Sequence, residues 1–188
     1  MDKNIALLIV SDSHIPERAD EIDKQVLEFI KQRSYDIVVH AGDIIGEDVL
    51  ELFKTFGSKC YAVQGNMDYL DLPEEEVFEV YGIRIGVIHG DQVRPRGNIE
   101  ALSMIAKELG VQILISGHTH NPFVVLDYSN ILHVNPGSIT GVWGGGGGSM
   151  RPSFIEMEVK SDRTVIVRLY EETLKGLVLK REEIFKFV

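Results

Sequence analysis

Five apolar runs in this chain each end in polar side chains of the kinds that bind metal ions. With the residues that follow them, these runs read IALLIV-SDSH, DIVV-HAGD, CYAVQ-GNMD, RIGVI-HGD and QILI-SGHTH. Continuous apolar runs are typical of strands covered on both faces, and in an open α/β sheet functional groups gather outside the carboxyl ends of the strands. The pattern therefore predicts an α/β fold with a cluster of polar side chains at one edge of a sheet.

The candidate metal ligands at this edge are carboxylates, imidazoles and one amide. They are Asp12, His14, Asp43, Asn66, His89, His118 and His120. Asp12 and His14 are two residues apart, as are His118 and His120, so each pair points to one side wherever the chain stays extended. Imidazole and carboxylate suit Mn, Fe, Ni or Zn better than Ca or Mg. The set has the composition of a site for two divalent metal ions in a hydrolase.

Two other histidines and the single cysteine are not candidate ligands, and we compare them with the seven residues that are. His40 and His133 lie inside strand-like runs and not past their ends, so we expect them in the core or hydrogen-bonded in support of a ligand. Cys60 lies in an apparent strand, where we expect it to be a small buried apolar residue.

Length and charge narrow the classes of function. With 188 residues, the chain fits one domain over residues 1–188. A net charge of -10 argues against bulk nucleic acid as a partner, because binding phosphate backbones requires clustered Lys and Arg. A small anionic substrate that metals attract locally is still allowed.

Cysteine content and hydropathy indicate a compartment. One cysteine cannot form a disulfide framework, which favours a reducing environment. No apolar stretch reaches the roughly 18 residues that a membrane span needs, and the N-terminus lacks a basic region before an apolar one. We therefore expect a cytoplasmic protein with no membrane partner.

The first half of the chain alternates strands and helices. Strands are expected at residues 4–10, 36–40 and 59–64. Between them, residues 20–33 predict a helix capped by Asp20, and residues 47–56 predict one that Gly57 stops. A βαβαβ order implies right-handed crossovers and a parallel sheet.

The second half predicts a hairpin, one helix and then a series of strands, with an antiparallel sheet indicated by the alternation at residues 154–159. Residues 77–81 and 83–89 flank Gly82 like a hairpin, and a helix is expected from Asn98, its cap, to the residue before Gly110. From residue 123 onward only strands are expected, with turns at 128–130, 161–163 and 175–176. Two packed sheets with helices outside would accommodate both halves. The sequence contains no internal repeat.

Five consecutive glycines at residues 144–148 form the one low-complexity segment. Such a run cannot hold a fixed backbone cheaply, so we expect a mobile loop. Three interpretations remain open, namely a plain surface loop, a lid beside the metal site and an engineered linker.

The motifs and their order resemble those of the calcineurin-like metallophosphoesterase superfamily. Its blocks are D-x-H, G-D, G-N-H-[DE], H-G and G-H-x-H. The matching residues here are Asp12 and His14; Gly42 and Asp43; Gly65, Asn66 and Asp68; His89 and Gly90; and Gly117, His118 and His120. Further stretches look like the small archaeal and bacterial phosphodiesterases and, more closely, like the retromer's vacuolar protein sorting subunit. These stretches are IHGDQVRPRG, ILISGHTH, NPGSITG and RPSFIEMEV.

This resemblance implies a four-layer α/β/β/α sandwich of two mixed sheets. It implies one metal ion on Asp12, His14 and His120 and a second on Asn66, His89 and His118, with Asp43 bridging the two. Two such ions, about 3.5 to 4 Å apart, would clamp a phosphoryl oxygen and create a bridging hydroxide near neutral pH. Mn is the expected metal, with Ni, Fe or Zn as alternatives.

The sequence departs from the superfamily pattern at Met67. The superfamily has a histidine there that stabilises the transition state or protonates the leaving oxygen, and a thioether can do neither. We therefore expect a slow enzyme or one limited to good leaving groups. The small phosphodiesterase branch also lacks this histidine, so Met67 is compatible with diester hydrolysis.

Four further residues near the motifs have weaker assignments. Asp68 is either an orienting group or a turn carboxylate, and Asp91, where relatives often have histidine, is expected in a turn. Arg94 and Arg96 follow His89 and could bind a substrate phosphate by charge-assisted hydrogen bonds, or else lie in a solvated loop.

Two functions remain open from the sequence. The first is a dinuclear metal-dependent phosphodiesterase that hydrolyses small phosphodiesters. The alternative is a protein-binding scaffold like the retromer subunit, with a weak or vestigial metal site. All seven candidate ligands are present, which favours the enzyme. The sequence leaves open the physiological substrate, the native metal and a homodimer through the C-terminal strands.

Overall fold

Two β-sheets stacked face to face form the centre of the computed structural model, which describes residues 3–188. The first sheet has six strands in the order β11-β10-β9-β1-β2-β3, in which β1, β2 and β3 are parallel and the others antiparallel. Its strands are β1 (Ile5–Val10), β2 (Tyr35–His40), β3 (Gly57–Ala62), β9 (Ser153–Val159), β10 (Thr164–Thr173) and β11 (Gly176–Lys186).

The second sheet has five strands in the order β4-β5-β6-β8-β7. Its three central strands run parallel, and an antiparallel strand flanks them on each side. The strands are β4 (Glu75–Val80), β5 (Ile83–Ile88), β6 (Ile113–Ile115), β7 (Phe123–Leu126) and β8 (Leu132–Asn135).

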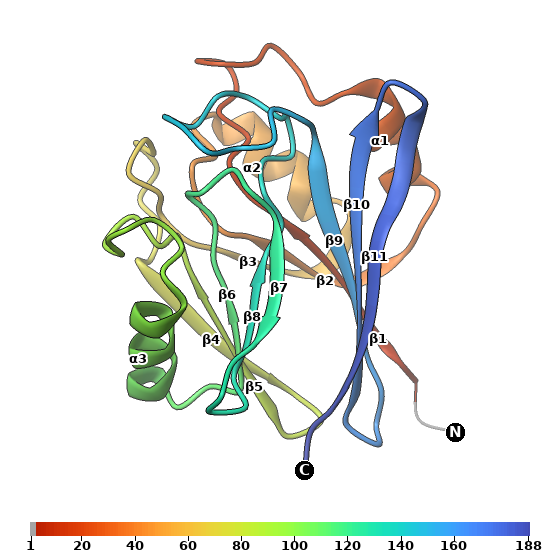
Figure 1. The fold of residues 1–188 in the computed structure, drawn as a ribbon. Helices are drawn as coiled ribbons and strands as arrows, with labels where there is room; N and C mark the ends of the chain where they lie inside the picture. The colour runs from red at the N-terminus through yellow and green to blue at the C-terminus, as the bar shows by residue number, and fades with distance from the viewer. Residues whose placement is uncertain (1–2) are drawn as a thin grey trace.

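Helices cover the outer faces of both sheets, which makes four layers. The helices are α1 (Lys24–Lys31), α2 (Glu47–Lys54) and α3 (Ile99–Leu109). Val26 of α1 and Phe53 of α2 pack with Leu8 and Val38 on the first sheet, whereas Leu102 of α3 packs on the second. Figure 1 shows α3 and α1 on opposite sides of the molecule. The structure is thus the α/β/β/α sandwich of two mixed sheets that the sequence predicts.

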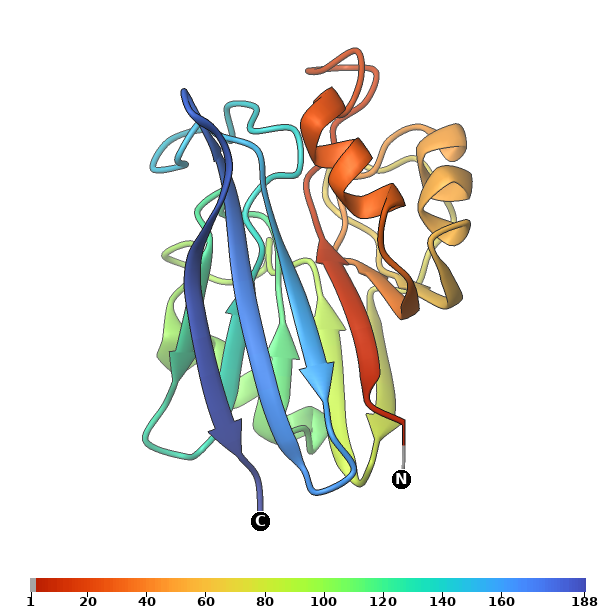
Figure 2. The same cartoon turned by 90° about the vertical axis from the view of Figure 1, so that its right-hand side faces the viewer.

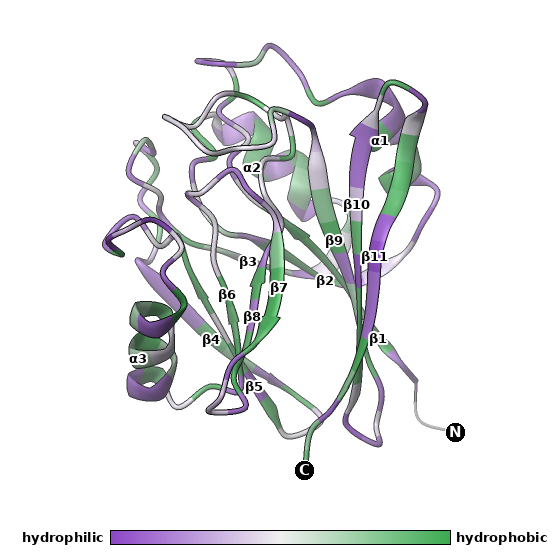
Figure 3. Ribbon diagram, viewed as in Figure 1, coloured by the Kyte–Doolittle hydropathy of each residue, from purple (hydrophilic) through white to green (hydrophobic). Residues whose placement is uncertain are grey.

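The main core lies between the sheets. Leu7 and Ile9 of the first sheet meet Ile85 and Ile113 of the second there, and all four side chains are fully buried. Figure 3 shows these strands as largely hydrophobic, whereas the middle of β11 is hydrophilic. The difference reflects the position of β11 at the sheet edge, where its side chains reach solvent.

Two predicted boundaries of the first half are wrong. The cap of α1 is Asp23 and not Asp20, because the Asp23 carboxylate accepts the backbone N–H groups of Gln25 and Val26. Helix α2 ends at Lys54, and Gly57 begins β3 instead of stopping the helix. Polar residues ahead of a helix are alternative caps, and only the packed geometry selects one.

Elements of the second half agree with the predictions. Asn98 caps α3 by accepting the N–H of Ala101, and Gly110 ends it in the left-handed conformation with φ of 65°. Tyr81 and Gly82 form the turn between β4 and β5. Beyond residue 123 the described elements are all strands. Among residues 3–188, no helix is both long and apolar enough for a membrane span.

The two histidines outside the candidate ligand set lie as expected, whereas the cysteine does not. His40 and His133 are buried; His40 Nε2 lies 2.7 Å from Ser13 Oγ, and His133 Nε2 lies 3.0 Å from Asp127 Oδ2. Cys60 is only half-buried, which corrects the expectation of a buried residue. The reason is that β3 is an edge strand, which the helices cover incompletely.

The carboxyl ends of the parallel strands place the candidate ligands at one end of the molecule. An isolated bridge between Ile15 and Ile45 continues the parallel pairing of β1 and β2 beyond both strands. In Figure 2 the loops after β1 and β2 lie at the upper end, whereas the C-terminus lies at the lower end.

Candidate metal centre

Backbone strain is concentrated at the candidate ligands. Five of the seven have positive φ although they are not glycine, with values between 49° and 66°. They are Asp12, His14, Asp43, His118 and His120. A residue with a side chain is uncommon in this conformation, and such strain persists only where the surrounding structure enforces it, often at functional sites. The strand ends therefore bend so that these side chains converge.

Glycines allow the loops to approach one another closely. A Cβ atom at Gly65 would lie 2.2 Å from the backbone nitrogen of Asp43, and one at Gly117 would lie 2.0 Å from Ser11 Oγ. Any side chain at either position would push the loops apart. Glycine beside the candidate ligands is thus a requirement of packing.

The first cluster contains Asp12, His14 and His120. Their ligand atoms all lie within 4.8 Å of one another, and all three residues are buried. His120 Nε2 lies 3.2 Å from Asp12 Oδ1 and 3.1 Å from His14 Nε2. Two imidazole nitrogens and a carboxylate oxygen that face one another at such distances form a donor set suited to a transition-metal cation.

Asp43 lies between this cluster and a second one. Its Oδ2 atom is 3.4 Å from His14 Nε2 and also 3.4 Å from His89 Nε2. The second cluster consists of Asp12, Asp43 and His89, again with ligand atoms within 4.8 Å. One carboxylate oxygen thus faces an imidazole of each cluster.

Hydrogen bonds orient the imidazoles. His89 Nδ1 lies 2.8 Å from the carbonyl oxygen of Ala41, and His120 Nδ1 lies 2.7 Å from that of Val142. Because a carbonyl only accepts, each Nδ1 carries a proton and donates it. The lone pair of a neutral ring is then on Nε2, which faces the carboxylates, as metal-binding histidines require.

Asp12 is held in a similar way. Its Oδ2 atom accepts hydrogen bonds from Ser11 Oγ at 2.6 Å and from the backbone N–H of His118 at 3.0 Å. The other oxygen, Oδ1, is buried without a hydrogen-bond partner. A buried carboxylate oxygen without a partner is costly, and a cation would satisfy it.

His118 and Asn66 lie outside the two clusters but line the same small cavity as Asp43 and His120. His118 Nε2, like His89 Nε2, is buried without a hydrogen-bond partner, and the two rings are 5.1 Å apart. The second cluster includes Asp12, whereas the family pattern implies His118 and Asn66 beside His89.

The pKa values follow from burial and charge. Burial lowers the pKa of His14 and of His118 to about 4, so both imidazoles are neutral at neutral pH. Burial also opposes the charge on His89, but the Asp43 carboxylate, 3.4 Å from Nε2, and the charge of Asp12 raise its pKa to about 9. Burial raises the pKa of Asp12, yet His120 and His89 lower it to about 2. The carboxylates therefore stay ionised and attract positive charge.

Asp68 supports the loops without facing the clusters. Its carboxylate accepts backbone N–H groups from four residues at 2.7 to 2.9 Å; the donors are Asp43, Ile44, Ile45 and Gly65. It thereby joins the loop after β2 to the loop after β3. Asp68 therefore holds the backbone of Asp43 in place and also closes the turn that begins at Gly65.

Two arginines, Arg18 and Arg96, line the small cavity, which has a volume of about 100 Å³. Arg96 donates to the carbonyl oxygen of Gly144, and Arg18 donates to that of Trp143 at 3.1 Å. Arg18 Nη2 also lies 3.8 Å from Met67 Sδ. Arg94, by contrast, donates to carbonyl oxygens of its own loop and does not line this cavity.

The glycine segment lies against the site. A Cβ atom at Gly144 would lie 2.4 Å from the His120 ring, and one at Gly148 would lie 2.9 Å from His120 Cβ. Together with the bond from Arg96 to Gly144, these contacts place the segment beside the site and not in a detached surface loop.

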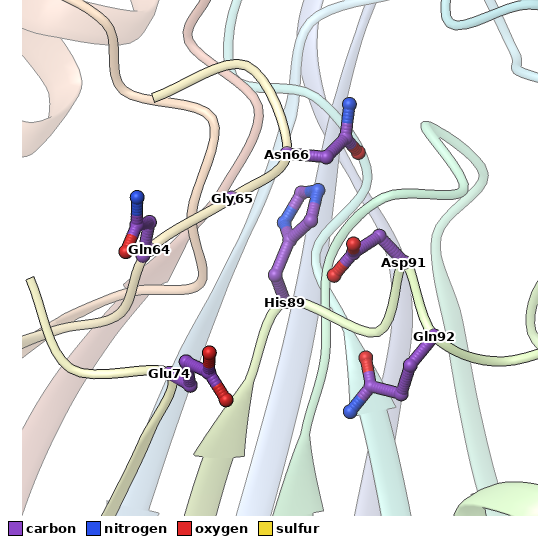
Figure 4. A pocket seen from close by; sticks show the side chains of 7 residues that line it. All are labelled: Gln64, Gly65, Asn66, Glu74, His89, Asp91 and Gln92. Atoms are coloured by element: carbon purple, nitrogen blue, oxygen red, sulfur yellow. The ribbon is translucent and has the colours of Figure 1, made fainter. Parts of the chain in front are cut away.

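A larger cavity, of about 370 Å³, adjoins the site on the side of His89 (Figure 4). Its walls come from the loop between β3 and β4 and from the loop after β5. Asp91 lies in a turn, as expected, and its side chain lines this cavity.

Sequence reasoning missed several residues at the two cavities. They are Arg18, Gln64, Glu74, Gln92 and Trp143. Three of these have a local signal, because they lie close to a candidate ligand along the chain: Arg18, Gln64 and Gln92. Glu74 and Trp143 reach the site through loop packing alone.

The chain belongs to the calcineurin-like phosphoesterase superfamily, whose domain it matches over residues 5–162. It is 47% identical over 132 residues to a probable metallophosphoesterase of Methanocaldococcus jannaschii, an alignment that covers 70% of this chain and 67% of that one. It is 40% identical over 135 residues to a probable metallophosphoesterase of Methanothermobacter thermautotrophicus, covering 70% and 76% of the two chains. The family resemblance drawn from the motifs is thereby confirmed.

Solved structures share the whole fold. Vacuolar protein sorting 29 of Cryptosporidium parvum superposes with a TM-score of 0.92 at 25% identity, covering 99% of this chain and all of that one. Vps29 of Entamoeba histolytica complexed with zinc superposes with a TM-score of 0.87 at 28% identity, covering 98% and 100%. These likenesses are compatible with both functions considered and do not separate them.

Proposed function

We propose that this metallophosphoesterase is a dinuclear metal-dependent phosphodiesterase that hydrolyses small phosphodiesters. The observation that carries the proposal is the position of Asp43 Oδ2, 3.4 Å from an imidazole nitrogen of each cluster. A carboxylate that faces two separate groups of donors is what two neighbouring cations require. The zinc complex of the Entamoeba histolytica relative supports a divalent ion in this fold.

The buried donors fit such ions. Asp12 Oδ1, His89 Nε2 and His118 Nε2 are buried atoms without hydrogen-bond partners, and all are ligand types of Mn, Fe, Ni or Zn. We propose that Asp12, His14 and His120 hold one ion, and that the other is held by Asn66, His89 and His118, with Asp43 shared. Mn is our first choice of metal. The ions would supply Lewis-acid activation of the phosphoryl group and of the attacking water.

The remaining side chains act on the substrate. Arg18 and Arg96 line the cavity that contains Asp43 and His118, so their guanidinium groups can bind the phosphoryl oxygens. Met67 offers no proton to a leaving group, and Arg18 beside it contributes a positive charge and hydrogen-bond donors. The protein therefore stabilises charge well but protonates poorly, which favours substrates with good leaving groups.

Metal reconstitution tests this proposal. Purified protein is stripped of metal and assayed with a chromogenic phosphodiester and the matching monoester during titration with Mn, Ni, Zn and Mg. We expect metal-restored cleavage of the diester. If no metal restores cleavage although ions bind, the phosphodiesterase is refuted, and the scaffold function with a vestigial metal site becomes the better account.

Asp43→Ala tests the shared ligand. Because it removes the carboxylate between the clusters, we expect it to abolish hydrolysis and to leave at most one tightly bound ion, measured by elemental analysis after dialysis. Asp20→Asn, which neutralises an exposed carboxylate elsewhere, is the matched control. Full activity in Asp43→Ala would refute the dinuclear mechanism.

A further inference from the structure

The larger cavity beside His89 has the opposite charge from the cavity that contains the arginines. It is lined by Gln64, Asn66, Glu74, His89, Asp91 and Gln92, together with one glycine. Two of these side chains are carboxylates and three are amides. Among the described residues that line it, none is Lys or Arg and none is Phe, Tyr or Trp.

The side chains that define this charge are free to bind a ligand. Within residues 3–188, no hydrogen bond or ion pair engages the side chains of Gln64, Glu74, Asp91 or Gln92. The backbone that carries them is held, because the N–H of Gln64 donates to the carbonyl oxygen of Pro73 at 2.8 Å and so brings Glu74 next to Gln64.

The cavity adjoins the candidate metal centre. Asn66 lines both cavities, and His89, whose buried Nε2 atom has no hydrogen-bond partner, lines the larger one. Figure 4 shows Asn66 at one end, Glu74 and Gln92 toward the other, and His89 between them. A phosphodiester whose phosphate lies at the metal centre can therefore extend one arm past His89 toward Glu74.

The side chains that line the larger cavity determine which kind of chemical group can bind there. Away from His89 and the metal centre, a second phosphate would face Glu74 and Asp91 with no Lys or Arg beside them, and a nucleobase would find no Phe, Tyr or Trp ring on which to stack. A cationic group, by contrast, would meet Glu74 and Asp91 as counter-charges, with amide oxygens as further acceptors. A zwitterionic substrate also avoids the long-range repulsion that a net charge of -10 exerts on an anion.

We propose that this cavity is a subsite for a cationic amino-alcohol arm, so that the preferred substrate is a zwitterionic phosphodiester with one such arm. This inference rests on the proposed phosphodiesterase function and names the substrate class of that site. Glu74 and Asp91 act as specificity-determining residues, and neither takes part in bond cleavage.

The test compares substrates that differ only in the charge of the arm. The first two substrates are p-nitrophenyl phosphorylcholine and its uncharged isostere, in which carbon replaces the ammonium nitrogen. The third substrate is a p-nitrophenyl diester of thymidylate. In the metal-loaded protein we expect kcat/KM to be about tenfold higher for the choline ester than for the isostere, the ratio of one good charge contact. Glu74→Gln should bring this ratio close to one.

Glu79→Gln is the matched control, because it removes the same charge from β4 at an exposed residue outside the cavity. It should leave the ratio unchanged. Three outcomes would each overturn the inference while leaving the phosphodiesterase intact. They are a ratio near one in the native protein, a ratio that Glu74→Gln does not alter, and a preference for the thymidylate diester.

A binding measurement separates the subsite from the reaction. Calorimetry with phosphorylcholine and its carbon isostere should show about tenfold tighter binding of the charged compound, and Glu74→Gln should remove the difference. If no diester is cleaved but this preference is present, the subsite stands and the phosphodiesterase fails. If both compounds bind equally, or neither binds, the subsite is refuted whatever the hydrolysis assay shows.

Discussion

Arg18 is the residue that the structure adds to the proposed site. It follows β1 in the same loop as Asp12 and His14, and its guanidinium group bonds to Trp143 and touches Met67. A permanent positive charge at this position can offset the negative charge that develops on the phosphoryl oxygens. We propose that this charge compensates in part for Met67, which stands where the superfamily pattern has a histidine.

Arg18→Gln should lower kcat/KM for a chromogenic diester by about 10- to 100-fold, because a hydrogen bond to a charged group contributes about 1.5 to 3 kcal/mol. Metal content should stay the same, since Arg18 is no ligand. The measurement is steady-state kinetics beside elemental analysis, and Arg181→Gln on the exposed edge strand is the control. Unchanged kinetics would exclude Arg18 from substrate binding.

Met67→His should shift the enzyme toward monoesters. A histidine can protonate the oxygen that leaves, and a general acid contributes 10² to 10⁴ in rate. We expect the ratio of monoester to diester turnover to rise by about tenfold or more. An unchanged ratio would mean that another group already supplies the proton.

At the scale of elements, Asp127 joins three of them. Its carboxylate accepts the N–H groups of Ser129 and Ile131 in the turn between β7 and β8, and it also bonds to Ser103 of α3 and His133 of β8. Ser, His and Asp meet here, but both partners face the same nitrogen, His133 Nε2. The group therefore has a structural role, which is to hold α3 on the second sheet.

This cluster predicts a pH-dependent contribution to stability. Burial raises the pKa of Asp127, but the hydrogen bonds from Ser103 and Ile131 outweigh burial and lower the pKa to about 2. Because the ordinary value of about 3.9 applies to the unfolded chain, the ionised carboxylate stabilises the fold above about pH 4. The contribution is lost as the pH falls from about 4 to about 2.

Asp127→Asn should lower the free energy of unfolding by about 1 to 2 kcal/mol at pH 7, since it replaces charged hydrogen bonds. The difference from the native protein should shrink at pH 3. Urea unfolding of both proteins at the two pH values provides the check, with Asp20→Asn as an exposed control. A difference that is equal at both pH values would contradict this role.

At the scale of the whole molecule, the proposed metal site ties the two sheets together. Asp12 and His14 follow β1 of the first sheet, whereas His89 and His118 follow β5 and β6 of the second. An ion held from both sheets binds the folded chain and not the unfolded one, so it must stabilise the fold.

Metal removal should therefore lower the melting temperature. At a free metal concentration about 100 times Kd the stabilisation is about 2.7 kcal/mol, which corresponds to roughly 5 to 10 °C for a chain of this size. Calorimetry with and without a chelator measures the shift, which should be smaller in Asp43→Ala. An identical melting temperature with and without chelator would contradict metal binding across the sheets.

Local patterns in the amino-acid sequence are sufficient to define the strand ends, the family and the types of the candidate ligands. Apolar runs specify buried strands locally, and polar residues directly after them must lie at the sheet edge whatever the rest of the chain does. This is why the sequence alone identifies Asp12, Asp43 and His89 as candidate ligands, and why it places Asn98 and Gly110 at the ends of α3.

The neighbours of these residues, by contrast, are set by tertiary packing. Asp23 rather than Asp20 caps α1, Arg18 faces Met67, and Glu74 shares a cavity with His89. Each of these outcomes depends on contacts between loops that are distant along the chain. Local patterns carry the preference of a residue for a strand, a cap or a turn, but the packing of separate loops selects among equivalent polar residues, and no local pattern records that choice.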